Sequence, residues 1–240
     1  MKLRNKISFE LAVLAALCAL PQAVVAGPPL ICHAIDIGQA KSLPWTSNTW
    51  NLSGEESYNI NRLVDDTLAL LSADTPVLVR METLRRATLY AQKDPMVAKQ
   101  LLFKMRTRAL DAESTGRQGA FASFDYGYLV ESYKEAKWMP GRRPADSGEG
   151  STIADLAGNF DGYGAVEKAI KLRGGDPEME FAAALITLGG SSYPGHQGHL
   201  QRALDGAKAD PLLARNLSTH FIGEKTETMA EMFKKRQSEN

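Results

Sequence analysis

The sequence predicts an all-α fold, and three observations support that prediction. Apolar residues recur every three or four positions through most of the chain after about residue 60, which is the periodicity of helices with one buried face. No segment alternates apolar and polar residues as a half-buried strand does. A phrase made of a basic residue, Ala, six further residues and Asp-Pro occurs three times, at 86–95, 168–177 and 202–211. Asp caps the free N–H groups of a first helical turn and Pro suits its first position, so each phrase predicts the start of a helix.

The first 26 residues have the composition of a signal peptide. Lys2, Arg4 and Lys6 precede an uncharged apolar run at 11–20, and small residues end at Ala26, where cleavage is expected. The apolar run is shorter than the roughly 20 residues that span a bilayer. We therefore expect residues 1–26 to be removed and residues 27–240 to be exported to the periplasm or the extracellular space. An uncleaved membrane anchor is the alternative.

The charge balance argues against nucleic acid as a partner. The whole chain has 28 basic and 28 acidic residues, and removal of the signal peptide leaves 25 basic and 27 acidic residues. A nearly neutral chain lacks the general attraction that a polyanion requires. After residue 26 there is no apolar run of membrane length, so no membrane span is expected in the mature chain. Its length suits one domain or two small ones.

Residues 27–54 are predicted to form an extended N-terminal arm that lies on the body of the protein. Pro28, Pro29 and Pro44 discourage helix formation. The segment is too apolar for a free tail, and its large apolar residues are Ile31, Ile35, Ile37, Trp45 and Trp50. We expect it to cover the open apolar end of the helices that follow.

Residues 55–139 are predicted to form a first helical subdomain of four helices. Ser53 and Glu56 have the spacing of a capping box and predict the start of the first helix, which ends before Pro76. Gly127 is expected to weaken the middle of the fourth helix. The three later helices are expected over 76–92, 95–109 and 119–137.

A segment rich in Pro, Gly and charge separates the two helical halves. Residues 140–151 are predicted to be an exposed loop or linker in which Arg142 and Arg143 are solvated. Residues 152–240 then form a second helical subdomain, with helices expected near residues 152, 163, 177, 200, 211 and 224.

The Asp-Pro phrases, the helix pairs and the 34-residue interval between Asp176 and Asp210 (210 − 176) resemble the tetratricopeptide repeat, or TPR. In that family each unit is two antiparallel helices, with small residues where they cross. Ala87, Ala169 and Ala203 match those crossing positions, although the separation from Ala to Pro is longer than in the family. The resemblance covers 76–112 and 163–221. It implies antiparallel helical hairpins in a TPR-like array or right-handed superhelix, whose concave surface binds a protein or peptide; a generic helical bundle is the alternative.

Four residues are weak candidates for metal ligands. His196 and His199 stand three residues apart in a glycine-rich stretch, and one helical turn would bring them together. Cys32 and His33 would complete a mixed set suited to zinc or copper. The alternative is that both histidines are only loop and first-turn residues of a helix. Cys32 is the single cysteine of the mature chain, so it is expected to be a buried small residue, an intermolecular disulfide partner or a reactive thiol.

Catalytic patterns have little support in the sequence. There is no Gly-x-Ser-x-Gly elbow, and the glycine pairs lack the Lys-Ser/Thr partner of a phosphate-binding loop. Adjacent acids on an exposed helix do not face each other across a sugar, as glycoside hydrolysis requires, and this applies to Glu55-Glu56 and Asp65-Asp66. The aromatic residues from Phe121 to Trp138 have the spacing of a helical core, with a ligand groove as the alternative.

These observations favour an exported, non-catalytic helical-repeat protein that serves as a scaffold for a protein or peptide partner and uses no cofactor. Two alternatives stay open. One is an exported all-α hydrolase that acts on cell-wall glycan. The other is a metal- or thiol-dependent envelope protein that uses Cys32 and His33.

Overall fold

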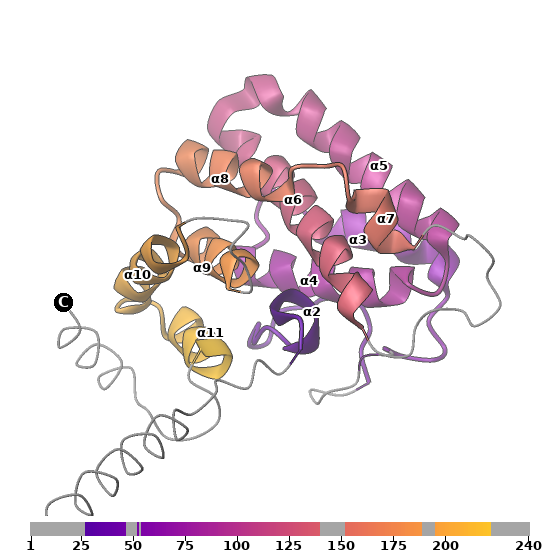
Figure 1. Cartoon of the computed structure of the whole chain (residues 1–240), viewed down its shortest axis with the longest axis horizontal. Helices are drawn as coiled ribbons and strands as arrows, with labels where there is room; N and C mark the ends of the chain where they lie inside the picture. The colour runs from indigo at the N-terminus through magenta and orange to yellow at the C-terminus, as the bar shows by residue number, and fades with distance from the viewer. Residues whose placement is uncertain (1–26, 47–51, 53, 140–151, 189–194, 222–240) are drawn as a thin grey trace, which may run out of the picture.

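The computed structural model describes residues 27–46, 52, 54–139, 152–188 and 195–221 (Figure 1). Within these ranges the protein has ten α-helices, three 3₁₀ segments and no strand, which confirms the all-α prediction. None of the described helices is both long and apolar enough to cross a membrane. The predicted signal peptide, the linker at 140–151 and the last helix expected from Glu224 lie outside the described residues.

The helices follow one another with short connections. Their bounds are α2 Pro29–Cys32, α3 Leu63–Leu70, α4 Val77–Ala91, α5 Pro95–Asp111, α6 Ala120–Glu135, α7 Ile153–Ala157, α8 Gly162–Arg173, α9 Pro177–Thr187, α10 His196–Ala207 and α11 Pro211–Phe221. The 3₁₀ segments are Ile60–Arg62, Glu113–Gln118 and Ala136–Trp138.

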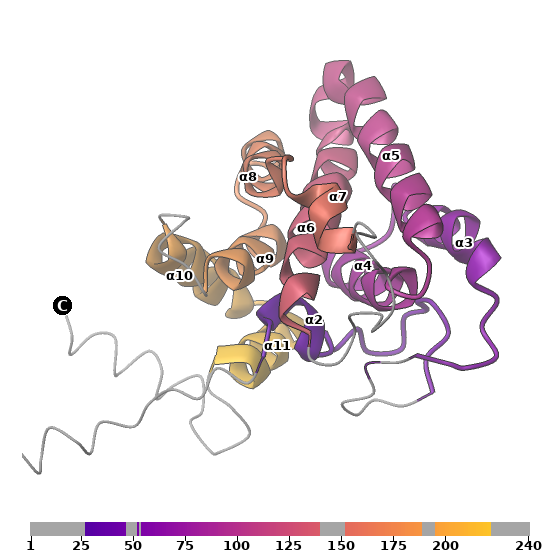
Figure 2. The ribbon, with the colours of Figure 1, turned by 45° about the vertical axis from the view of Figure 1, so that its right-hand side comes forward.

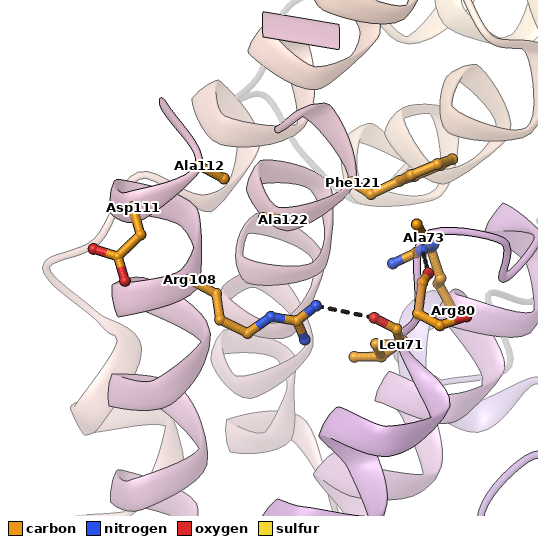
Figure 3. Close-up of a pocket in the computed structure, with 9 residues that line it drawn as sticks. Leu71, Ala73, Arg80, Arg108, Asp111, Ala112, Phe121 and Ala122 are labelled. Carbon is orange, nitrogen blue, oxygen red and sulfur yellow. Dashed lines mark hydrogen bonds between the residues drawn. The ribbon is translucent and has the colours of Figure 1, made fainter. Parts of the chain in front are cut away.

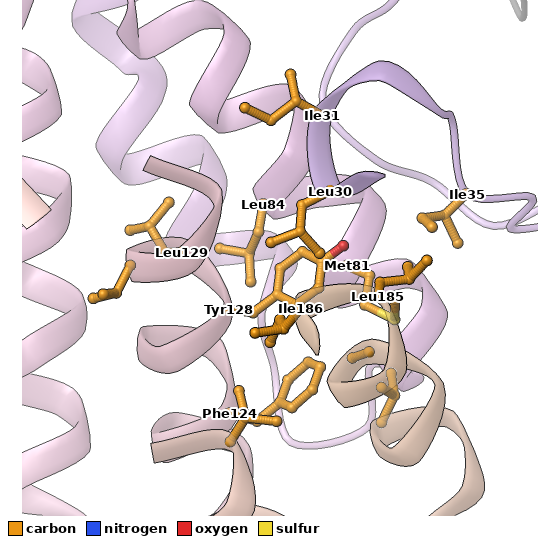
Figure 4. Close-up of a cluster of buried hydrophobic side chains, with 14 of the residues drawn as sticks. Leu30, Ile31, Ile35, Met81, Leu84, Phe124, Tyr128, Leu129, Leu185 and Ile186 are labelled. Carbon is orange, nitrogen blue, oxygen red and sulfur yellow. The ribbon is translucent and has the colours of Figure 1, made fainter. Parts of the chain in front are cut away.

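Helix α6 lies at the centre of the molecule. Helices α4, α5, α7 and α8 pack against it, with the most extensive contact to α8, and α9 and α10 form a second closely packed pair (Figures 1 and 2). One buried core joins these parts, with Leu30 of α2, Leu84 of α4, Tyr128 of α6 and Leu185 of α9 drawn together in Figure 4. Helices from both predicted subdomains contribute to this core. The TPR-like repeat arrangement and the division into subdomains remain predictions.

The close contact between α6 and α8 depends on two glycines. A Cβ atom on Gly127 would lie 2.5 Å from the carbonyl oxygen of Gly162, and one on Gly162 would lie 2.6 Å from the carbonyl oxygen of Gly127. Both distances are shorter than side-chain carbon atoms tolerate, and the blocking atoms belong to backbone. Gly127 therefore allows the two helices to cross, in addition to its expected cost within α6.

The three Asp-Pro phrases begin helices as predicted. The Asp94 carboxylate accepts hydrogen bonds from the N–H groups of Met96 and Val97 at the start of α5. Asp176 and Asp210 cap α9 and α11 in the same way. Each aspartate satisfies free N–H groups of the first turn, so these helix starts are encoded locally.

The predicted start of the first helix is wrong. Glu56 lies in a turn, Ser53 is outside the described residues, and α3 begins only at Leu63, after a 3₁₀ turn that the Asn59 side chain caps. The reason is a tertiary contact, because the Tyr90 hydroxyl accepts a hydrogen bond from the Glu55 N–H (2.9 Å) and holds this stretch against α4. Pro76 also differs slightly from expectation, since it is the N-cap of α4 and not its first helical residue.

The N-terminal arm is only partly extended. Pro29 opens a short helix, α2, because proline is tolerated in a first turn where its missing N–H is not needed. Leu30, Ile31, Ile35 and Leu43 are buried in the core. Three charged side chains of α4 hold the segment by hydrogen bonds to its backbone. Glu82 accepts one from the Ile35 N–H (3.0 Å). Arg85 donates to the Ile31 carbonyl (3.0 Å), and Arg86 donates to the Leu43 carbonyl (2.6 Å).

Three helices are capped by carboxylates that come from other helices. Glu178 of α9 accepts a hydrogen bond from the Leu78 N–H of α4 (3.3 Å), and Glu135 of α6 accepts one from the Leu30 N–H of α2 (2.9 Å). Glu131 of α6 accepts one from the Tyr163 N–H of α8 (3.0 Å). Such contacts satisfy orphan N–H groups in the first turns of the three helices.

Candidate ligand-binding site

A cavity of about 370 Å³ opens between α3, α4, α5 and α6. Its lining residues are Leu71, Ser72, Ala73, Arg80, Arg108, Asp111, Ala112, Phe121 and Ala122 (Figure 3). We call it the arginine pocket, because two guanidinium groups and one aromatic ring are its largest side-chain features. Its volume is at the lower end of the range of small-molecule sites.

Arg80 forms the buried wall of the pocket. Its side chain is 1% exposed and pairs with Asp125 of α6 at 2.7 Å. Its other nitrogens donate to the carbonyl oxygens of Thr75 (2.9 Å) and Ser72. A fully bonded buried arginine fixes the loop between α3 and α4 in one conformation and is not itself free to bind a ligand.

Two arginines near the pocket have unused hydrogen-bonding capacity: Arg173, whose buried Nε atom has no partner within the described residues, and Arg108, which lines the pocket. One terminal nitrogen of Arg108, Nη2, donates to the Leu71 carbonyl (2.9 Å), as Figure 3 shows. The other, Nη1, is buried and has no hydrogen-bond partner within the described part of the chain. Asp111 also lines the pocket, but its carboxylate points away from this guanidinium (Figure 3).

The pocket has more positive than negative charge at its base. Asp125 is the buried carboxylate that faces Arg80, and its Oδ1 atom has no partner among the described residues. Burial raises the pKa of Asp125 to about 6, although Arg80 and Arg108 both favour its ionised form. Two guanidinium groups therefore stand against one carboxylate at the base of the pocket, and burial makes that carboxylate easier to protonate, while Asp111 adds a second carboxylate to the lining.

The Phe121 ring contacts two guanidinium groups, those of Arg80 and Arg173. The Cζ atom of Arg80 is 4.1 Å from the ring centroid and that of Arg173 is 4.5 Å from it. Arg173 also forms an ion pair with Asp176 at 3.2 Å. Stacking on the ring holds these cations in place.

A second polar cluster joins α8, α9 and α10 around His199. The Nδ1 atom of His199 lies 2.5 Å from Glu180, and its Nε2 atom lies 2.7 Å from the Tyr163 hydroxyl. Arg202 donates to the other oxygen of Glu180 at 2.6 Å. The order Tyr–His–Glu is that of a proton relay, but burial raises the pKa of Tyr163 to about 12, which disfavours a nucleophilic phenolate. The cluster therefore fits a structural connection between the three helices.

The structure does not bring the four predicted metal ligands together. No group of three or more His, Cys, Asp or Glu side chains suited to a metal is present among the residues described. The Nδ1 atom of His196 lies 3.0 Å from the Ala184 carbonyl oxygen, while His199 is bonded to Glu180 and Tyr163. The expectation that His199 is only a first-turn residue is incomplete, because it is buried at the centre of a network.

Cys32 and His33 face different neighbours. The Cys32 thiol is buried without a disulfide, and its sulfur lies 3.9 Å from that of Met139. Burial raises the pKa of this thiol, with a further contribution from Glu135, so it is not an activated thiolate. The ring of His33 lies 5.7 Å from that of His220.

The remaining sequence candidates are divided between core and surface. Asp66 accepts hydrogen bonds from Tyr58 (2.9 Å) and Arg62 (3.0 Å). Phe124, Tyr128 and Tyr133 are fully buried, in agreement with a core role. Phe121 instead lines the arginine pocket, the place that the ligand-groove alternative requires of it. Arg142 and Arg143 lie outside the described residues.

The sequence reasoning missed Arg80, Arg108 and Asp125. These residues come from three helices and are far apart in the sequence. One signal was present, because Asp125 interrupts the aromatic face of α6 with an acidic residue that has no neighbouring basic residue on its own helix.

Comparison with known proteins gives no relative. No family model, no curated protein and no solved structure matches this chain.

Proposed function

We propose that this chain is an exported, non-catalytic binding protein that holds a carboxylate group of a peptide partner in the arginine pocket. The observation that carries the proposal is the Nη1 group of Arg108, a buried donor without a partner at the edge of a concave pocket. An unused buried donor costs free energy, and a ligand carboxylate would remove that cost.

The chemistry of the pocket favours an anion of modest size. A guanidinium binds carboxylates with short, charge-assisted hydrogen bonds. The volume of about 370 Å³ suits one amino-acid residue, and Leu71, Ala112 and Ala122 give its side chain apolar neighbours. The terminal residue of a peptide combines both features.

Titration calorimetry with N-acetyl-leucine and N-acetyl-leucine amide tests the proposal. The two ligands have the same size, but the amide lacks the negative charge. We expect the acid to bind more tightly by about tenfold or more, because a hydrogen bond to a charged group contributes about 1.5–3 kcal/mol. Arg108→Gln should abolish this preference.

Arg106→Gln is the matched control, since Arg106 is an exposed arginine on the same helix that stacks on Phe160, 5.2 Å from its ring centroid, outside the pocket. Equal binding of acid and amide, or equal effects of the two substitutions, would contradict the proposal. Export is tested separately: intact mass of the protein from the envelope fraction should show a chain that begins at Gly27.

A further inference from the structure

The outward face of α5 has a row of exposed apolar side chains. Met96, Phe103 and Leu110 are 64%, 48% and 55% exposed, respectively. Seven residues make nearly two helical turns, so the three side chains form one narrow stripe about 21 Å long. The core-facing side of α5 is already used, because Val97, Leu101, Leu102 and Met105 are buried. Helix α5 lies at an outer edge of the molecule, which leaves this stripe accessible (Figure 2).

Basic side chains flank the stripe on both sides. If Met96, Phe103 and Leu110 are placed at the d positions of a heptad, Lys99 and Arg106 occupy g positions and Lys104 an e position. All three basic residues are exposed. Asp111 is the acidic residue at an e position, at the C-terminal end of the helix. The a positions are Gln100 and Thr107, so the face combines a narrow apolar seam of d positions with a net positive border.

We propose that this face of α5 docks an amphipathic helix of a partner protein whose apolar seam is bordered by Glu and Asp. Charge complementarity selects this occupant, because e and g positions determine which helices pair. A second copy of the same face would place Lys99, Lys104 and Arg106 opposite like charges. A lipid surface requires a broad apolar helix face, whereas the broad apolar face of α5 is buried in the core.

Fluorescence anisotropy with two synthetic probes tests the docking surface. Both are labelled three-heptad helical peptides with Leu at a and d, and they differ only in having Glu or Lys at e and g. We expect the Glu peptide to bind and the Lys peptide to bind at least tenfold more weakly. Binding of the Glu peptide should weaken at least tenfold when the salt is raised from about 50 mM to about 500 mM, because the flanking charges are exposed.

Substitutions distinguish the contribution of the apolar seam to binding from that of its charged border. Phe103→Ser should weaken binding of the Glu peptide at least tenfold, and the double variant Lys99→Glu/Lys104→Glu should reverse the preference between the peptides. Lys171→Glu, an exposed charge change on α8, should leave both affinities unchanged. All these positions are on the surface, and an unchanged melting temperature verifies that each variant is folded.

Three results would overturn the proposal. The first is equal binding of the two peptides, or a preference that the double variant does not reverse. The second is a dimer, seen by light scattering, that Phe103→Ser dissociates. The third is sedimentation with vesicles containing about 30% phosphatidylglycerol that depends on Phe103 in the absence of any peptide selectivity. Because Arg108 is unchanged throughout, failure here is distinct from failure of the arginine pocket.

Discussion

Replacing Glu135 by Gln should remove much of the loss of stability that the protein undergoes as the pH rises from about 5 to about 9. Glu135 caps α2 through the Leu30 N–H, and burial raises its pKa to about 8, with a smaller contribution from Glu131. The folded protein therefore holds a proton on this carboxyl at a pH where the unfolded chain has released it. Its contribution to stability is complete below about pH 4.5 and is lost as the pH rises through about 8.

The size of the effect follows from the two pKa values. The pKa of Glu135 is about 8 in the folded protein and 4.5 in the reference state. Each pH unit between these values corresponds to about 1.4 kcal/mol, so the wild-type protein loses about 4 kcal/mol between about pH 5 and pH 9 through this group. A Gln side chain retains an oxygen that accepts the Leu30 hydrogen bond and has no proton to release.

Urea denaturation of the wild-type protein and of Glu135→Gln at about pH 5, 7 and 9 measures the difference. Glu178, whose pKa is raised to about 7, and His220, whose pKa is lowered to about 4, also make stability depend on pH, but both proteins share them. The variant should gain about 4 kcal/mol relative to wild type from the lowest to the highest pH. As a control, Glu56→Gln changes an exposed glutamate, and its free energy of unfolding should depend on pH as that of the wild type does. A constant offset between Glu135→Gln and wild type at all three pH values would refute the reasoning.

Three further substitutions test the fold, each by urea denaturation. Gly127→Ala should lower the free energy of unfolding by about 1–3 kcal/mol, because its Cβ would lie 2.5 Å from a backbone oxygen. The matched Gly158→Ala, with space for a Cβ, should change it by less than about 0.5 kcal/mol. Equal losses of stability in the two variants would contradict the close crossing of α6 and α8. Asp94→Ala should cost about 1 kcal/mol and Asp94→Asn much less, since Asn also caps helices; equal losses would exclude a capping role. Tyr163→Phe removes the partner of His199 Nε2 and should cost about 1–3 kcal/mol, and an unchanged midpoint would show that the bond is not stabilising.

The helix starts could be predicted because their causes are local. Asp94, Asp176 and Asp210 bond to N–H groups two and three residues further along the same chain. The same holds for α7, where Thr152 and Asp155 form a capping box. Patterns of this kind depend on a few neighbouring residues, so one sequence is enough to recognise them.

The buried charges could not be predicted, because their burial depends on segments remote in sequence. Glu82, Arg85 and Arg86 have the i, i+3 and i, i+4 spacing of exposed ion pairs on a helix surface. They are instead covered by the N-terminal segment, whose backbone they bind. The pairing of Glu180 with His199 likewise joins two helices whose contact no local pattern indicates. The prediction of where α3 begins failed for the same reason, because Tyr90, which belongs to another helix, holds the Glu55 backbone.

Helix α6 explains why these remote contacts give one arrangement. Glu131 and Glu135 are one turn apart on this helix, and they cap α8 and α2, respectively. Asp125, further toward its N-terminus, pairs with Arg80 of α4. An apolar core of similar volume would accept several rotations of α2, α4 and α8 about α6. An acidic side chain buried at each contact satisfies its partner in one orientation only, and leaving a buried polar group unpaired costs about 1–3 kcal/mol, or more for a charged group. The same pairing positions Arg80 beside Arg108, so the residues that order the core also set the charge of the proposed binding pocket.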